Sequence, residues 1–329
     1  MGMGEIAEAT PWRLTTHDSR LTTKDIMRII SLLPSTTEIV CALGLADDLV
    51  AVTHECDYPP VARTKPAVTA SALDAASNSA TIDRLVAGSI HDHRAIYSLD
   101  EDLLRELRPD LILTQELCDV CAVSYSDVQK AARILPDGDT TIVSLEPLTL
   151  DDILATISLV GRLTTREEQA GALVAGLRAR IARVAEVAAT ATTRPRVYCM
   201  EWIDPPFRAG HWIPELARLA GGEELLGHEG VPSTRTTWEE IAAAAPDVVV
   251  AMPCGFDADR AKRELCLVAG RLEWQGLPAV ARGDVWVTDG SAYFARPGPR
   301  MVDALEILAH ALHPTLFPAP PPHDLRRFV

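Results

Sequence analysis

Apolar and polar residues follow one another along the chain in blocks that predict short strands followed by helices. Residues 28–33 form an apolar run, a proline ends it, and Ser35 and Thr36 stand where a helix over residues 38–43 needs its N-cap. Residues 49–53 and 111–114 predict two further strands, and the second is apolar throughout, as in a parallel strand covered on both faces. Strand, polar loop and helix in this order predict an α/β fold.

One pattern occurs twice. Residues 102–115 read DLLRELRPDLILTQ and residues 239–253 read EEIAAAAPDVVVAMP. In each copy an acidic residue opens a short helix, Pro-Asp ends it, and a buried strand runs into a loop that carries cysteine, Cys118 and Cys121 in the first copy and Cys254 in the second. Two similar βα lobes that direct loops to one side predict a cleft between lobes, where small-molecule sites are common.

The segment between the two copies has a different pattern. Residues 149–191 contain no proline, and an apolar stripe through Ile153, Ile157, Val160 and Leu177 is interrupted only near residues 161–165. Roughly 40 helical residues span about 60 Å, so we expect one long helix that bridges two lobes. The alternative is one continuous doubly wound domain.

These patterns divide the chain into five parts. They are a polar N-terminal extension (1–27), an N-terminal α/β lobe (28–147), a linking helix (148–194), a C-terminal α/β lobe (195–316) and a Pro-rich tail (317–329). A length of 329 residues suits two domains, and 47% hydrophobic content is typical of a soluble protein.

Net charge limits the partners that the protein can bind, and the cysteine content indicates its cellular compartment. A net charge of −15 disfavours nucleic acid and anionic membrane as partners, and no apolar stretch is long enough for membrane insertion. Residues 1–27 show no apolar run of signal-peptide length, no twin arginine and no lipobox-like cysteine. Seven irregularly spaced cysteines indicate reduced thiols. We expect a cytoplasmic protein, or an exported one if the start codon is misassigned.

The order of several segments resembles a known family. They are SLLPSTTE (31–38), ECDYPP (55–60), RPDLILTQ (108–115), DPPFRAG (204–210), LARLAGGEELL (216–226), APDVVVA (245–251) and RPGPR (296–300). Over about residues 28–315 the chain is similar to the helix-linked substrate-binding proteins of ABC importers for cobalamin and iron siderophores, most of all to the cobalamin-binding branch. The resemblance implies two Rossmann-like lobes joined by one long spine helix, with the ligand cleft between the lobes.

The resemblance also implies positions for ligand contacts. They are Ser35, Thr36, His54, Glu55, Tyr58, Gln115, Glu116, Trp202, Phe207, Trp212, Arg235, Phe256, Tyr293, Phe294 and Arg296. Seven of the 16 aromatic residues fall in this set, and a flat corrin ring needs such faces. The alternative for each aromatic is packing of a lobe, and for each arginine a solvated ion pair. Residues 115–121 and Ser233 replace two tryptophans that the cobalamin binder carries.

Two smaller sets of residues are candidates for docking a partner protein and for binding a metal. Asp102 and Glu239 stand where importer-bound relatives carry one surface glutamate per lobe that meets the membrane subunit, and the alternative is helix capping. Cys56, Cys118, Cys121 and Cys254 leave strands on both lobes and predict thiolates near a metal-centred ligand. Buried packing, structural zinc and a redox pair are the alternatives, and His54, His91 and His93 are candidate imidazole ligands.

No catalytic motif accompanies these features. The chain has no GxSxG, P-loop, HExxH or GxGxxG segment. We therefore expect a non-enzymatic binding protein for cobalamin or a related corrinoid, used as a cytosolic carrier or sensor, with an ABC transporter membrane subunit as partner if it is exported. The alternatives are binding of haem or a ferric siderophore, a corrinoid-processing enzyme, and a scaffold without ligand.

Overall fold

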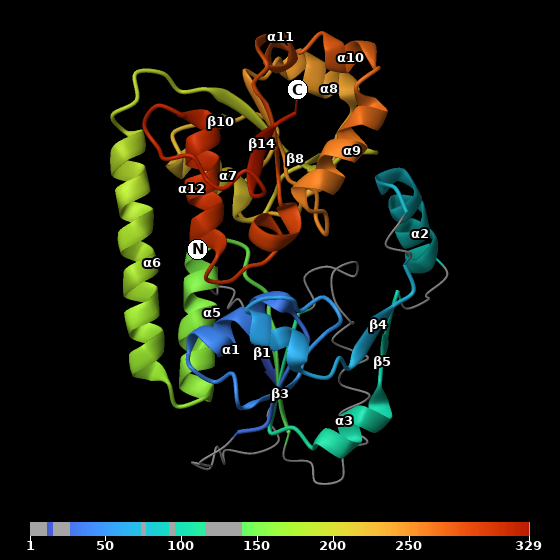
Figure 1. Ribbon diagram of the computed structural model, residues 1–329, viewed down its shortest axis with the longest axis vertical. Coiled ribbons are helices and arrows are strands. Elements are labelled where there is room, and N and C mark those ends of the chain that lie inside the picture. The colour runs from blue at the N-terminus through green and yellow to red at the C-terminus, as the bar shows by residue number, and fades with distance from the viewer. Residues whose placement is uncertain (1–11, 16–26, 74–76, 92–95, 116–139, 329) are drawn as a thin grey trace, which may run out of the picture.

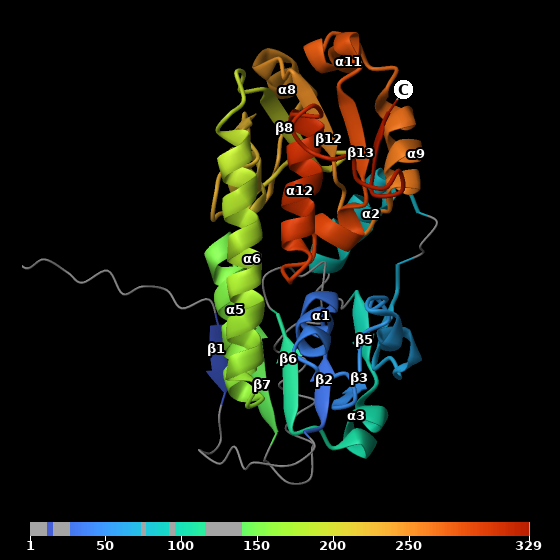
Figure 2. The same cartoon turned by 60° about the vertical axis from the view of Figure 1, so that its left-hand side comes forward.

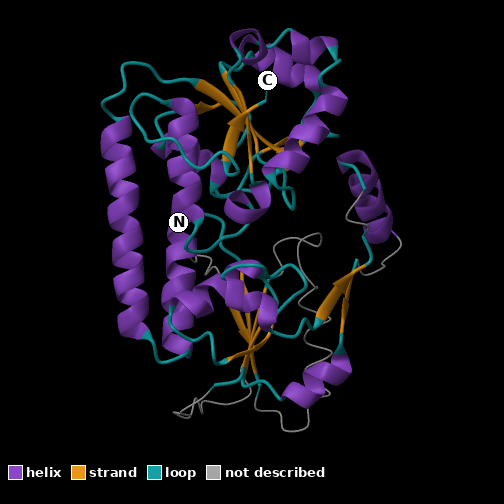
Figure 3. Ribbon diagram, in the orientation of Figure 1, coloured by secondary structure: helices purple, strands orange, loops and turns teal. Residues whose placement is uncertain are grey.

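Two separate β-sheets form the centres of two lobes, stacked one above the other in Figure 1. The structure, a computed structural model, describes residues 12–15, 27–73, 77–91, 96–115 and 140–328. The sheet of the first lobe, the N-lobe, comes from residues 12–145, and the sheet of the second, the C-lobe, from residues 196–327. Figure 3 shows the two sheets apart, each with helices around it. The predicted two-lobed α/β architecture is confirmed.

The N-lobe sheet has four parallel strands and one antiparallel edge strand. Its order is β1 (Trp12–Thr15), β7 (Thr141–Leu145), β6 (Leu111–Thr114), β2 (Ile29–Ser31) and β3 (Leu49–Ala51). Helices α1 (Pro34–Ala42) and α3 (Glu101–Leu107) connect the strands, and the turn η1 (Pro60–Thr64) follows β3. The central strand β6 is buried at every position, as its continuous apolar sequence predicts. Strand β1 comes from the stretch that the sequence assigned to an N-terminal extension.

The C-lobe sheet is mixed, because the strands at residues 207–208 and 325–327 run antiparallel to its central strands. Its order is β11 (Thr234–Arg235), β9 (Phe207–Arg208), β8 (Arg196–Trp202), β12 (Val248–Ala251), β13 (Val285–Thr288) and β14 (Leu325–Arg327), with β10 (Glu223–Glu224) also on β8. Its helices are α7 (Ile213–Leu219), α8 (Trp238–Ala244), α9 (Ala258–Val268), α10 (Leu272–Gln275), α11 (Pro278–Arg282) and α12 (Met301–Leu312), and η2 (Gly290–Phe294) is a π-helical turn. Strand β14 comes from the predicted Pro-rich tail.

The repeated sequence pattern produces the same local structure in both lobes. Arg108 and Ala245 end α3 and α8 in the left-handed conformation, and Pro-Asp follows. The carboxylate of Asp110 then accepts a hydrogen bond from the backbone N–H of Arg28, at 2.9 Å, just before the neighbouring strand. Asp247 does the same at the start of β8. Each Pro-Asp pair therefore ends a helix and fixes the start of a parallel strand beside it.

The predicted linking helix is divided into α5 (Leu150–Leu163) and α6 (Glu167–Ala188), which pack together as a helical hairpin along one side of the molecule. Thr165 adopts a left-handed backbone, with φ of 54°, and ends the regular helix. A Cβ on Gly161 would lie 2.5 Å from the Cβ of Ala170, so this glycine allows the two helices to approach closely.

Helix α6 runs along both lobes (Figure 2), and α5 also packs in both cores. Leu177 packs in the N-lobe core and Val184 in the C-lobe core. Its 22 residues extend about 33 Å, roughly half the length expected of one continuous helix. None of the helices that the structure describes is long and apolar enough to cross a bilayer.

A small antiparallel ribbon on the other side of the molecule carries one more helix. Strands β4 (Thr69–Ser71) and β5 (Tyr97–Leu99) pair with each other, and α2 (Ser79–His91) lies between them in the sequence. We call the described residues 69–73, 77–91 and 96–99 the strap. Figures 1 and 2 both show α2 beyond the end of the ribbon, near the C-lobe.

Candidate functional site

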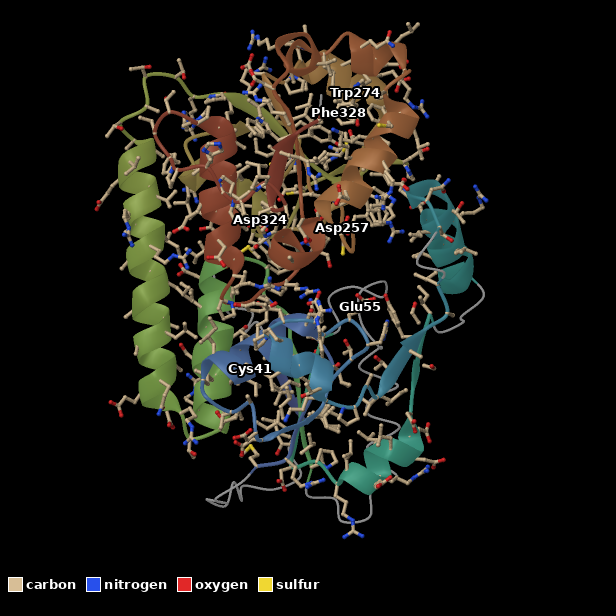
Figure 4. The ribbon with its side chains drawn as sticks, in the orientation of Figure 1. Cys41, Glu55, Asp257, Trp274, Asp324 and Phe328 are labelled. Carbon is tan, nitrogen blue, oxygen red and sulfur yellow. The ribbon has the colours of Figure 1, made fainter. Side chains whose placement is uncertain are left out.

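The carboxyl ends of the parallel strands in both sheets point toward the boundary between the lobes. The loop after β3 carries His54 to Tyr58, and Arg296, which follows β13, reaches this loop. Figure 4 shows Glu55 on the side of the N-lobe that faces the C-lobe, and Asp257 on the opposing edge. Ligands of open α/β sheets bind beyond the carboxyl ends of strands, so this boundary is the candidate site.

Arg296 joins the two lobes at the centre of this boundary. Its buried guanidinium lies 2.5 Å from Asp57 Oδ1 and 3.6 Å from Glu38 Oε1, and it donates to the backbone oxygen of Glu55 at 3.4 Å. Burial opposes ionisation of Asp57, but the hydrogen bond and charge of Arg296 outweigh it and lower the pKa of the carboxyl. Arg296, predicted to contact ligand, is thus already bound to N-lobe acids.

A second arginine makes a more buried ion pair across the same boundary. Arg300 donates to both carboxylate oxygens of Glu38, at 2.9 and 2.6 Å, and the Glu38 side chain is only 2% exposed. Burial raises the pKa of Glu38 although both arginines act against it. The Arg300 guanidinium also lies over the rings of Tyr58, at 4.1 Å, and Tyr293, at 5.4 Å. It therefore stands between one aromatic ring from each lobe.

The tyrosines on either side of Arg300 differ in exposure. Tyr58 is 45% exposed, so much of its surface remains available for contact. Tyr293 is half-buried, its hydroxyl donates to Asp324 at 2.9 Å, and burial raises its pKa. Both were predicted ligand contacts, and the structure brings them to the same arginine.

A second group of predicted aromatics lies on the C-lobe side of the boundary. Trp202, at the end of β8, and Phe256, after β12, have ring centroids 5.1 Å apart. The Arg260 guanidinium lies 3.7 Å from the centroid of the Phe256 ring. Phe256 is only 2% exposed, because side chains of the strap cover it. The indole nitrogen of Trp202 is buried and finds no hydrogen-bond partner among the described residues.

An enclosed carboxyl precedes Trp202 in the chain. Glu201 accepts hydrogen bonds from the Ser233 hydroxyl and from the backbone N–H of Gly210. Burial raises its pKa to about 7. At neutral pH this carboxyl is divided between an ionised acceptor and a protonated donor, and either form suits an amide. Ser233, where the resemblance expects a second tryptophan, instead hydrogen-bonds this acid.

Phe207 and Arg235 lie at one edge of the C-lobe sheet. Phe207 is half-buried in β9, opposite Trp202 in the register, and the Arg235 guanidinium lies 5.9 Å from its ring centroid. Arg235 is exposed and pairs with Asp83 of the strap at 2.9 Å. The arginine is therefore already engaged by an acid from the other lobe.

Four predicted contacts are buried, three of them inside a lobe and one, Ser35, against Gly298 of the other lobe. Trp212 and Phe294 are buried in the C-lobe core, where the Trp212 indole donates to the backbone oxygen of Phe294 at 3.1 Å. Ser35 and Thr36 are buried in the first turn of α1, and the Thr36 hydroxyl bonds that of Ser31 at 2.5 Å. Aromatic content and position in a loop do not reveal which face a side chain presents, so the sequence could not show that these residues are buried.

The predicted sulfur set is only partly described. Cys56 is buried in the N-lobe core, 3.1 Å from the Thr37 hydroxyl, and burial raises the pKa of its thiol. Cys254 is half-buried after β12, whereas Cys118, Cys121 and Glu116 lie outside the described residues. In the described part of the chain, no three His, Cys, Asp or Glu side chains come together as a metal site.

The remaining predicted residues of the N-lobe surround the loop after β3. The His54 ring lies 2.7 Å from the Thr69 hydroxyl, and a hydrogen bond with that ring lowers the pKa of Glu55. Gln115 is half-buried at the carboxyl end of β6. His93 lies outside the described residues, and His91 ends α2.

Asp102 and Glu239 stand in the first turns of α3 and α8, one in each lobe. The Asp102 side chain is 94% exposed and contacts Arg105 of its own helix, and Glu239 is also exposed. Acidic residues favour the N-terminal turn of a helix in any case. Their placement is compatible with both capping and partner docking.

Several residues of the boundary were missed by sequence reasoning. They are Glu38, Asp57, Ser79, Asp83, Glu201, Arg260, Glu264 and Arg300. Glu38 and Arg300 fall inside SLLPSTTE and RPGPR, which supported the resemblance, but nothing local to either segment shows that they pair. The strap residues lie in a stretch rich in Ala, Ser, Thr and Asp, whose short apolar period at Ile82 and Val86 was not recognised.

Residues 29–292 match the model of a family described as periplasmic binding protein. The chain belongs to this family. It is 27% identical over 285 residues to a vitamin B12-binding protein of Vibrio cholerae, which covers 85% of this chain and 86% of that protein. The fold is similar to the crystal structure of a periplasmic vitamin B12 binding protein of Vibrio cholerae, with a TM-score of 0.61, 24% identity and coverage of 87% and 96%.

It is also similar to a periplasmic heme binding protein from Pseudomonas aeruginosa, with a TM-score of 0.69, 20% identity and coverage of 92% and 97%. At this identity the likeness concerns the fold alone. The predicted relationship to substrate-binding proteins of the cobalamin and iron-siderophore type is confirmed.

The comparisons also bear on two further predictions, the absence of enzymatic activity and the cytoplasmic location. Members of the family bind small ligands for ABC transporters and are not enzymes, as predicted. The predicted cytoplasmic location is contradicted, because the family and both solved structures are described as periplasmic. That prediction depended on thiol content and on the first 27 residues, which are weaker indicators of compartment than the relationship of the whole fold.

Proposed function

We propose that this protein binds cobalamin or a related corrinoid between its lobes and presents it to the membrane subunit of an ABC importer. The observation that carries the proposal is the 27% identity to a vitamin B12-binding protein, which extends over 85% of the chain. The relationship therefore includes both lobes and the boundary between them.

The chemistry of the boundary supports a broad, flat ligand with amide arms. Tyr58 offers an exposed aromatic face, and the Arg300 guanidinium beneath it fixes the ring. The enclosed Glu201 carboxyl and the Trp202 indole nitrogen, which no described residue bonds, are hydrogen-bonding groups suited to amide arms.

Haem is a second candidate because of Tyr58. A tyrosine oxygen is an established axial ligand of haem iron, and this tyrosine is the most exposed of the predicted aromatics. Corrin contact requires only the ring face, whereas iron ligation requires the hydroxyl. The two candidates therefore predict different effects of removing that hydroxyl.

Delivery to an importer requires a surface on each lobe that the membrane subunit can reach. Asp102 and Glu239 meet this requirement, since both are exposed and each lobe supplies one. We infer that their carboxylates contact basic residues of the membrane subunit, as the family resemblance implies.

Calorimetric titration with cyanocobalamin, hydroxocobalamin and haemin tests the ligand. We expect both cobalamins to bind the wild-type protein and the Tyr58→Phe variant alike, and Tyr58→Ala to bind roughly tenfold more weakly. Leu272→Ala, at a side chain 81% exposed on the far side of the C-lobe, is the matched control and should bind as wild type. Binding of haemin alone, with loss in Tyr58→Phe, would replace corrinoid by haem.

A further inference from the structure

The strap belongs to the N-lobe in sequence but docks on the C-lobe through a buried polar contact. The backbone N–H and hydroxyl of Ser79, at the start of α2, both donate to Glu264 Oε2 of α9, at 2.9 and 2.7 Å. Ser79 and Glu264 are both buried. A buried carboxylate needs such donors, so this contact defines where α2 sits.

Two arginines of the C-lobe hold the strap on either side of this contact. Arg260 donates to the backbone oxygen of Ser77 at 2.7 Å. Arg235 donates to both carboxylate oxygens of Asp83 at 2.9 Å. The Arg235 side chain remains more than half exposed, and ion pairs of this kind are weak.

The apolar side of the strap covers an aromatic residue of the C-lobe. Ile82 and Val86 of α2, together with Ile96 before β5, pack against Phe256, which also packs against Trp202. The apolar contact is small, because its buried centre consists of three aliphatic side chains of the strap and the one aromatic ring that they cover. It lies on the side of the molecule away from the α5–α6 hairpin (Figures 1 and 2).

The surface that the strap covers coincides with part of the expected ligand surface. Phe256, Trp202 and Arg235 were each predicted to contact ligand, and the strap engages all three. A flat ring can stack on Phe256 only after Ile82 and Val86 have moved away. The strap and such a ring therefore exclude each other at this face.

We propose that the strap is an intrachain competitor for the ligand site: it docks on the Phe256–Trp202 face when the site is empty and is displaced when a ring ligand stacks there. The ring ligand rests on the proposed function, whereas the docking of the strap does not. Because an occluded site lowers apparent affinity by the fraction of molecules that are open, weakening the strap should favour binding.

Hydrogen exchange of the ligand-free protein tests the docking. We expect backbone amides of residues 79–88 to exchange roughly tenfold faster in the double variant Ser79→Ala, Asp83→Asn than in wild type, while α6 is unchanged. Leu85→Ala is the matched control, since Leu85 is on the same helix but 46% exposed. Equal exchange in wild type and double variant would overturn the docking contact.

Stopped-flow binding of hydroxocobalamin tests the competition. The double variant should associate several-fold faster than wild type, and residues 79–88 of wild type should lose protection when ligand binds. Slower association together with added protection of α2 would make the strap a wall of the site and overturn the proposal. If hydroxocobalamin binds neither protein, the proposed function fails. The comparison of hydrogen exchange between the ligand-free wild type and double variant still tests whether the strap docks through these contacts.

Discussion

Two connections join the lobes on opposite sides of the central ion pairs of Arg296 and Arg300, and they are built from different chemistry. On one side the α5–α6 hairpin buries apolar side chains of both lobes, and Arg180 of α6 pairs with Asp303 and Glu306 of α12. On the other side the strap makes a few polar contacts and covers one aromatic residue. Apolar burial is spread over many contacts and is hard to undo in part, whereas a few polar anchors can be released and replaced. The difference indicates a permanent side and a releasable side.

The buried pair of Glu38 and Arg300 should matter most to stability. Arg300→Met leaves the Glu38 carboxylate buried, with Arg296 at 3.6 Å as its one remaining cation among the described residues, so we expect the free energy of unfolding to fall by about 3–5 kcal/mol. Arg282→Met breaks an exposed pair with Asp247 and should cost below about 1 kcal/mol. Urea unfolding measures both, and equal losses would show that burial of the pair adds nothing.

Changes in the α5–α6 hairpin should have the second-largest effect on the free energy of unfolding. Leu177 is buried between α6 and the N-lobe core, so Leu177→Ala should lower the free energy of unfolding by about 2–5 kcal/mol through the cavity it leaves. The exposed Leu272→Ala should change it by less than about 0.5 kcal/mol. A small effect of Leu177→Ala would mean that the hairpin is not the permanent connection.

The Glu201 carboxyl at the end of β8 should make stability depend on pH near neutrality. The folded pKa of Glu201 is raised to about 7 from 4.5, so the folded state binds the proton more tightly and its stability falls as pH rises between these values. We expect Glu201→Gln to be more stable than wild type by roughly 1–2 kcal/mol at pH 8 and nearly equal to it at pH 4.5. Thermal unfolding across this range checks the sign, and a variant less stable than wild type at pH 8 would contradict it.

The strap itself should have the smallest effect on global stability. Asp83→Asn removes a partly exposed ion pair, so we expect the free energy of unfolding to change by less than about 1 kcal/mol. A loss as large as that of Leu177→Ala in the same urea titration would remove the distinction between the two sides.

Local chemistry explains which parts of this architecture could be predicted. The Pro-Asp turns carry their own helix stop and strand anchor, so Asp110 and Asp247 were recognisable in sequence as parts of one repeated unit. The break between α5 and α6 depends on Thr165, whose left-handed backbone no neighbouring residue demands, and one helix was therefore expected. Local patterns are informative only where the structural cause is also local.

The boundary between the lobes depends on distant partners and was harder to predict. Glu38 and Arg300 are 262 residues apart, and Ser79 and Glu264 are 185 apart. Residues 66–94 are rich in Ala, Ser, Thr and Asp, and the short apolar period at Ile82, Leu85 and Val86 does not show which partner the helix packs against. Exposed aromatics such as Tyr58 and core aromatics such as Trp212 occur in similar loop sequences. The sequence around them therefore does not distinguish an exposed aromatic ring from a buried one.

The central claim is that a corrinoid binds between the lobes, and comparison of hydrogen exchange with and without hydroxocobalamin tests it most directly. The account predicts slower exchange in the loop of residues 54–58, faster exchange in residues 79–88 and no change in α6. A groove between α5 and α6, lined by Asp151, Ser158 and Arg178, offers a site away from the boundary. Protection confined to that groove, or no change anywhere under saturating hydroxocobalamin, would contradict the account.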